Sequence, residues 1–258
     1  MLILSSFALL LSNSLAIRRD VAILYCRIGI IILSYSIYLA YNNLFITSFD
    51  NGIGIFGGLF YVSSITQSFH ILILILSLFI LGMTAFFPRK LIFTKYLGAF
   101  EILFSKMKVL KKLTIANIIV KNGEQFSIVE YTLVLLFVIT GSILLVSSND
   151  FISVFLSIEL QSYGLYLICA VYKNSESSTS SSLTYFLIGA LASCLILLGI
   201  SLIYSNLGIT YLDSFYIINN LSSMQDQDIN ICLILSPYPV LLIIVGLLIK
   251  LSAAPFHF

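Results

Sequence analysis

Long apolar stretches alternate with short polar links along this chain of 258 residues. A helix needs about 20 mostly apolar residues to cross a bilayer, and seven stretches of the chain come close to that length. They are 1–17, 21–41, 69–87, 128–146, 151–172, 183–205 and 240–258. The pattern predicts an all-α, polytopic membrane protein with seven transmembrane helices.

The longest polar link divides the predicted helices into two groups. Residues 1–127 hold the first three spans and this basic link, and residues 128–258 hold the other four spans. The first span is followed, not preceded, by Arg18 and Arg19. Because a signal peptide carries its positive charge before its apolar core, we expect the first span to be retained.

Positive charges fall in every second link. They follow the first, third and fifth spans, at Arg18, Arg19, Arg89, Lys90, Lys95, Lys106, Lys108, Lys111, Lys112, Lys121 and Lys173. Basic links face the cytoplasm or, in a mitochondrion, the matrix. We therefore expect Phe258 on the basic side and the N-terminus on the opposite side. The long basic link, with a short surface helix around 106–112, is expected to contact lipid headgroups or another subunit, and not nucleic acid.

The composition supports a membrane protein and disfavours redox chemistry within the chain. Only 9% of the residues are charged, against about 25% in typical soluble domains. The four cysteines form no C-x-x-C pair, so their spacing offers no iron–sulfur or zinc site. Residues 52–57 match G-x-G-x-x-G, but that fingerprint needs a preceding strand and a following helix. These glycines lie in a link between spans, where they predict a turn.

Three charged residues lie well inside the predicted spans: Arg27, Glu159 and Lys250. Arg27 is under two turns from a helix end, so its guanidinium can reach the interface. Glu159 lies ~12 Å, and Lys250 ~15 Å, from the end of its span that faces away from the basic links, at 1.5 Å per residue. Two opposite charges at similar depth on different helices are predicted to interact.

A buried Glu–Lys pair predicts proton or cation transfer. A nearby carboxylate favours the charged form of a lysine, whereas loss of water favours the neutral form. A lysine held between these two effects can take up and release a proton. The alternative is a static ion pair that only fixes the register of two helices.

The neighbours of both charges favour a functional site. Glu159 shares its helix face with three polar residues, Ser162, Tyr163 and Tyr166, and this face is expected to point to the protein interior or to water. Pro255 lacks an N–H and is predicted to break the seventh helix, as happens at ion sites of transporters. On the face of Lys250, His257 is either a proton relay or an ordinary helix-end residue.

Three stretches resemble one known family. Residues 148–163 (SNDFISVFLSIELQSY), 182–205 and 250–257 (KLSAAPFH) are similar to helices five, six and seven of the NADH dehydrogenase subunit 2 family, in its filamentous-fungal mitochondrial form. Members of this family are antiporter-like membrane subunits of respiratory complex I. The resemblance implies an antiporter-like helix bundle of fourteen spans with two inverted five-helix repeats, of which this chain would hold seven spans.

The resemblance implies a role for each matching residue. Glu159 would be the essential membrane glutamate, Lys250 the proton-loading lysine of the broken seventh helix, and His257 a residue on the path toward the central axis. Family members commonly carry a lysine where this chain has Thr184, so no ionisable role is expected there.

The implied function is that of a proton-translocating subunit of NADH:ubiquinone oxidoreductase in the mitochondrial inner membrane, with its N-terminus in the intermembrane space. NADH, FMN, iron–sulfur clusters and ubiquinone would bind elsewhere in the complex, and none to this chain. Its partners would be other membrane-arm subunits and the lipid bilayer. A sodium–proton antiporter subunit and a structural subunit without transport are the alternatives.

The end of the chain generates a prediction about its gene. The family normally continues with Trp after Pro-Phe-His-Phe, fungal mitochondria read TGA as Trp, and the chain contains no Trp. We expect the codon after Phe258 to be TGA, read as a stop by the standard code. Sequencing the downstream DNA checks this expectation, and any other codon would leave a partial sequence as the explanation.

Overall fold

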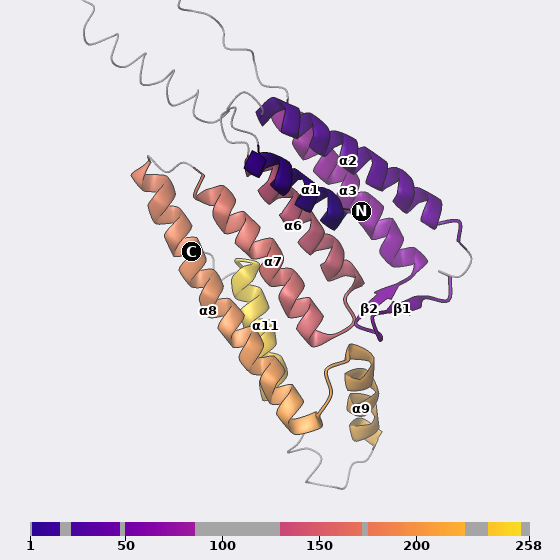
Figure 1. Cartoon of the computed structure of the whole chain (residues 1–258). Helices are drawn as coiled ribbons and strands as arrows, with labels where there is room; N and C mark the ends of the chain where they lie inside the picture. Colours follow the sequence, from indigo (N-terminus) through magenta and orange to yellow (C-terminus); the bar gives the residue numbers. More distant parts are fainter. Residues whose placement is uncertain are drawn as a thin grey trace, which may run out of the picture.

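The computed structural model describes residues 2–15, 22–46, 50–85, 130–171, 175–224 and 237–253 (Figure 1). Within these ranges the helices are α1 (Leu2–Leu15), α2 (Ala22–Asn43), α3 (Ser64–Ala85), α6 (Glu130–Ser147), α7 (Phe151–Cys169), α8 (Glu176–Leu207), α9 (Leu212–Met224) and α11 (Tyr238–Lys250). Two short strands, β1 (Ile53–Ile55) and β2 (Phe60–Val62), form an antiparallel hairpin.

A helix lies at each of the seven predicted spans. Five of these helices, α2, α3, α6, α7 and α8, are long and apolar enough to cross a membrane, and α1 and α11 are shorter apolar helices. The prediction of a polytopic helical membrane protein is thus confirmed. The surface helix expected around 106–112 lies outside the described residues.

Helix α6 joins two groups of helices. It packs against α1, α2 and α3 on one side and against α7 on the other, and α8 and α11 continue the second group (Figure 1). The first group is built around completely buried leucines, with Leu33 of α2, Leu81 of α3 and Leu136 of α6 at most 1% exposed. Many outward-facing side chains are large and apolar, as in Met83, which is 82% exposed. Such faces suit lipid or further membrane helices.

Glycines allow α8 and α11 to pack closely. A Cβ placed on Gly199 of α8 would lie 2.8 Å from the carbonyl oxygen of Pro239, and one on Gly246 of α11 would lie 2.9 Å from that of Ala192. Small residues at such contacts let backbones approach, which is how helices associate without a hydrophobic driving force in lipid. The two contacts run in opposite directions along the helices, so α8 and α11 are antiparallel.

Helix α8 begins earlier than the sequence predicted. Residues 173–182 were expected to form a polar loop, but the helix starts at Glu176. The serines of this segment donate their hydroxyl protons to carbonyls of the preceding turn, as Ser181 does to Ser178 at 3.0 Å. Ser178 instead reaches Cys169 at the end of α7, at 2.8 Å. Polar side chains satisfied in this way do not break a helix.

The glycine-rich link forms the hairpin, which confirms the predicted turn. Gly52, Gly57 and Gly58 have positive φ angles of 74°, 70° and 96°, and strand pairing joins Ile53 with Val62. The hairpin and the α8–α9 connection hold the start of α7: the N–H of Asn149 donates to Leu59 at 2.9 Å, and that of Phe151 donates to Thr210 at 3.0 Å. Neither the hairpin nor α9 was predicted.

The close approach of α8 and α11 can be tested by adding one methyl group. Gly199→Ala should lower the free energy of unfolding by about 1–3 kcal/mol, because the new Cβ meets backbone atoms that cannot move aside. Gly82→Ala is the matched control, since nothing lies within 4 Å of its Cβ position. The control should be neutral or stabilising, since Ala favours helix by up to about 1 kcal/mol over Gly. Unfolding in mixed detergent micelles, followed by circular dichroism, measures both, and equal values would contradict the packing.

Candidate proton-transfer site

The start of α7 fixes the position of Glu159. Asp150 is the N-cap of this helix, and its carboxylate accepts a hydrogen bond from the N–H of Ile152 at 3.3 Å. Ser153 Oγ accepts from the N–H of Asp150 at 3.3 Å, which completes a capping box. A helix start held in this way, and tied to the hairpin, sets the depth and direction of every side chain that follows.

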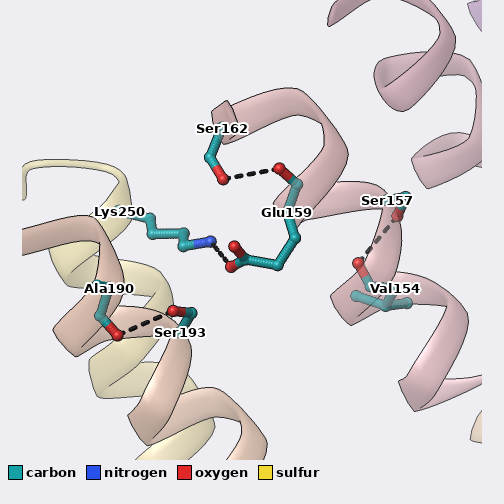
Figure 2. A network of polar contacts seen from close by, with 7 residues as sticks. All are labelled: Val154, Ser157, Glu159, Ser162, Ala190, Ser193 and Lys250. Atoms are coloured by element: carbon teal, nitrogen blue, oxygen red, sulfur yellow. Dashed lines mark hydrogen bonds and ion pairs between the residues drawn. The ribbon is translucent and has the colours of Figure 1, made fainter. Parts of the chain in front are cut away.

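Glu159 and Lys250 form an ion pair between α7 and α11. The Nζ atom of Lys250 donates to Oε1 of Glu159 (Figure 2). Each side chain is 11% exposed, and the two residues are 91 positions apart in the sequence. The predicted interaction is thus present in the structure, and each charge has its counter-charge in a largely dehydrated place.

Lys250 is the last residue of α11, close to the predicted break near Pro255. Pro255 itself lies outside the described residues. A turn follows Lys250, in which Ser252 has a φ of 52° and the N–H of Ala253 bonds to Leu248 at 3.0 Å. A helix C-terminus carries partial negative charge and favours a cation. The end of α11 therefore stabilises the ammonium of Lys250, in addition to Glu159.

The polar face of α7 points inward only in part. Ser162 and Tyr166 are buried, at 8% and 9% exposure, whereas Tyr163 is 54% exposed. Ser162 donates its hydroxyl proton to the carbonyl of Glu159 at 3.0 Å (Figure 2). Tyr163, at i+4, lies on the other side of Glu159 from Ser162 and Tyr166, at i+3 and i+7, so the buried face extends toward those two residues.

A cavity of about 890 Å³ adjoins Lys250. It lies between α7, α8 and the turn after α11, at the end of the molecule where α7 ends and α8 begins. Lys250 and a set of hydroxyl groups line it: Ser162, Tyr166, Ser181, Thr184, Tyr185 and Ser252. These groups can hold water next to the ammonium, since a cavity water needs two to four polar partners.

Tyr166 is held firmly at the wall of this cavity. Its ring meets Tyr185 and Phe186 of α8 edge to face, with centroids 4.8 Å and 5.5 Å apart. A Cβ on Gly189 would lie only 1.7 Å from the Tyr166 hydroxyl. Gly189 therefore provides the space that lets this hydroxyl reach α8.

The other predicted residues have different outcomes. Arg27 is exposed on α2, which fits a side chain that reaches the interface. His257 lies outside the described residues, so its role stays a prediction. His70, to which no role was assigned from the sequence, has a buried side chain, and its Nε2 bonds to the carbonyl of Ile143 at 3.1 Å. A histidine within an apolar stretch was the available signal. Among the described residues, no three His, Cys, Asp or Glu side chains come together as metal ligands would.

The part of the chain that holds the ion pair matches a known family. Residues 148–258 match the family described as NADH:quinone oxidoreductase/Mrp antiporter, transmembrane. The matched residues include α7, α8 and α11, so both members of the ion pair lie among them.

The chain is similar to subunits of NADH-ubiquinone and NADH-quinone oxidoreductases. NADH-ubiquinone oxidoreductase chain 2 of Rhizopus oryzae is 39% identical over 257 residues, which is 100% of this chain and 45% of the relative. NADH-quinone oxidoreductase subunit N of Rhodospirillum rubrum is 37% identical over 128 residues, or 50% of this chain and 25% of the relative. The chain thus resembles subunit 2 along its whole length, as predicted, and spans less than half of the relatives it matches.

Two solved structures share the fold. A chain of "Respiratory complex I from Thermus thermophilus with bound Aureothin" matches with a TM-score of 0.63 and 20% identity, over 100% of this chain and 44% of that one. A chain of an archaeal membrane-bound sulfane sulfur reductase matches with a TM-score of 0.58 and 15% identity, over 99% and 44%. Both come from respiratory membrane complexes.

The energetic coupling of the pair can be tested with a double-mutant cycle. Glu159→Gln alone and Lys250→Met alone should each destabilise the protein by about 3–5 kcal/mol, because each leaves one buried charge without a partner. The double variant should lose less than the sum, since it leaves no charge behind. Unfolding in mixed micelles gives the three values, and additive losses would mean that the two side chains do not interact.

Proposed function

We propose that the chain is part of a proton-translocating membrane subunit of NADH:ubiquinone oxidoreductase, in which Lys250 takes up and releases the proton. The observation that carries this proposal is the ion pair of Lys250 with Glu159 beside a cavity that has six hydroxyl groups among its mostly apolar lining. The similarity of the chain to NADH-ubiquinone oxidoreductase chain 2 supports its assignment to that enzyme. Catalytic redox groups would lie on other subunits, with which this chain would assemble in the membrane arm.

Glu159 would control whether Lys250 keeps its proton. While the carboxylate is in contact, it stabilises the ammonium, and so does the C-terminal end of α11. When a conformational change separates the two side chains, the ammonium is left in a dry environment, where the neutral amine is favoured. The proton then leaves Lys250, and the carboxylate draws a new one back when the contact re-forms.

The residues around the ion pair have different roles in the proposed proton transfer. The cavity brings water and hydroxyl groups to Lys250, which supplies a route for protons. Glu159 is held by the capped start of α7, and its carbonyl accepts from Ser162. His257 would continue the path toward the central axis of the complex.

The proposed setting is the mitochondrial inner membrane. Every Lys and Arg of the links falls on one side of the predicted spans, which by the positive-inside rule is the matrix side. The N-terminus would then face the intermembrane space. The cavity beside Lys250 would open toward the matrix, since α7 ends and α8 begins next to the basic link at Lys173. Residues 1–127 and 128–258 would be the N-terminal unit and the first part of an antiporter-like repeat.

Two replacements of Lys250 separate proton transfer from a static ion pair. In the full-length subunit within the assembled complex, Lys250→Met should lower the number of protons pumped per electron. Lys250→Arg should do the same, because arginine keeps the charge but does not release its proton. A static ion pair would instead tolerate arginine. Proton release and NADH oxidation, measured together in proteoliposomes, give the ratio.

Arg27→Met is the control for the loss of a membrane cation, since Arg27 is exposed on α2 and away from the pair. It should leave the ratio unchanged. Native gels check that each variant assembles. An unchanged ratio in both Lys250 variants would reject the proposal, and sodium-dependent transport without NADH oxidation would favour an antiporter.

A further inference from the structure

A second cavity lies in the other group of helices, far along the chain from the ion pair. It has a volume of about 360 Å³ and is lined by residues of α1, α2, α3 and α6. Five of its twelve lining residues are polar, and the other seven are apolar; the polar ones are Ser36, Asn43, Gln67, His70 and Thr140. This volume has room for several waters, at about 30 Å³ each, and the site offers more than the two to four polar partners that one water needs.

The polar groups are arranged by depth. Asn43 is the last residue of α2, and Gln67 is in the first turn of α3. Deeper in the bundle, Ser36, His70 and Thr140 lie ~9–11 Å from the ends of their helices, at 1.5 Å per residue. All these ends are on the side of the hairpin, where α2 ends, α3 begins and α6 ends. Polar groups thus lead from that surface to a buried polar layer that contains a histidine.

The hydrogen bonds of this layer leave hydrogen-bond acceptors available to water. Ser36 and Thr140 donate their hydroxyl protons to Leu33 and Phe137, both at 2.8 Å, so their oxygens can still accept. His70 Nε2 lies 3.1 Å from the carbonyl of Ile143. Because a carbonyl only accepts, Nε2 must carry a proton. In the neutral ring Nδ1 is then the proton acceptor, and it is the atom that gains a proton when the ring becomes charged.

No other titratable group faces His70 from the described parts of the helices around it. The lining residues of α1, α2 and α6 are apolar, or carry hydroxyl or amide groups. Tyr38 and Tyr41 of α2 are exposed, at 61% and 53%. Arg27 and Glu130 lie near the opposite ends of α2 and α6. Proton exchange in this cavity would therefore take place at His70.

We propose that this cavity is a water-filled vestibule that makes His70 a proton-binding site, reached from the hairpin side of the membrane and separate from the Glu159–Lys250 pair. Water enters past Asn43 and Gln67 and reaches the polar layer. A proton from this water binds Nδ1, while the Nε2–H bond to α6 is kept. That bond becomes charge-assisted and stronger when the ring is protonated. The site does not depend on proton pumping by Lys250.

Side-specific thiol labelling tests the water. Ser36→Cys is compared with Ser34→Cys in the full-length subunit without its native cysteines. Both serines bond to the preceding helical turn, but Ser36 is buried at the cavity and Ser34 is exposed on the helix surface, where lipid would cover it. A charged, membrane-impermeant methanethiosulfonate should modify Ser36→Cys from the hairpin side at least about tenfold faster, because only a hydrated thiol forms the reactive thiolate. Thr140→Cys repeats the test from α6 if Ser36→Cys fails to fold.

Nitrogen NMR of the histidine-labelled protein tests the proton site. The signals of His70 are assigned by their loss in His70→Gln. They should show the Nε2–H neutral ring at high pH and conversion to imidazolium as the sample is acidified between about pH 9 and pH 5. Equal labelling of the two cysteines would show a dry or lipid-filled cavity and overturn the proposal. So would labelling from the opposite side, or a His70 signal that stays neutral throughout.

Discussion

The structure depends on keeping two opposite charges together inside an apolar helix bundle. Glu159 alone would be a buried carboxylate in a membrane helix, where an isolated charge is strongly unfavourable. Lys250 removes that penalty by direct contact, and the C-terminal end of α11 helps to hold the cation. The contact requires that α7 and α11 keep the same axial position and the same rotation relative to each other. Other features of this half of the molecule maintain that arrangement.

Those features act at both ends of the pair. At the hairpin side, the capping box at Asp150 and the bonds from Asn149 and Phe151 hold the start of α7. For Lys250, Gly199 and Gly246 let α11 pack tightly on α8, near the start of α11 and one turn before Lys250. Since α8 also packs on α7, it supports the lysine helix against the glutamate helix. The proposed opening and closing of the pair needs this support, because it would bring the two side chains back to the same contact.

The sequence predicts the spans well because lipid imposes one simple requirement, a long apolar stretch. The pairing of Glu159 with Lys250 also follows from the sequence, since few side chains can neutralise a charge at that depth. Other features depend on contacts that no local pattern reveals. The turn that follows α11, with its positive φ at Ser252, is one of them. Helix α8 extends through serines that bond to their own helix, and Tyr163 lies too far round α7 to be buried.

Release of the Lys250 proton during turnover can be measured directly, because the cavity beside Lys250 gives a reagent room to reach the amine. Only a neutral amine is acylated, so a short pulse of isotopically labelled acetic anhydride reports the unprotonated state. Mass spectrometry should find acetylated Lys250 when the intact complex oxidises NADH, and little in the resting complex, where Glu159 holds the ammonium. Equal labelling in the two states, or none in either, would contradict proton release from Lys250.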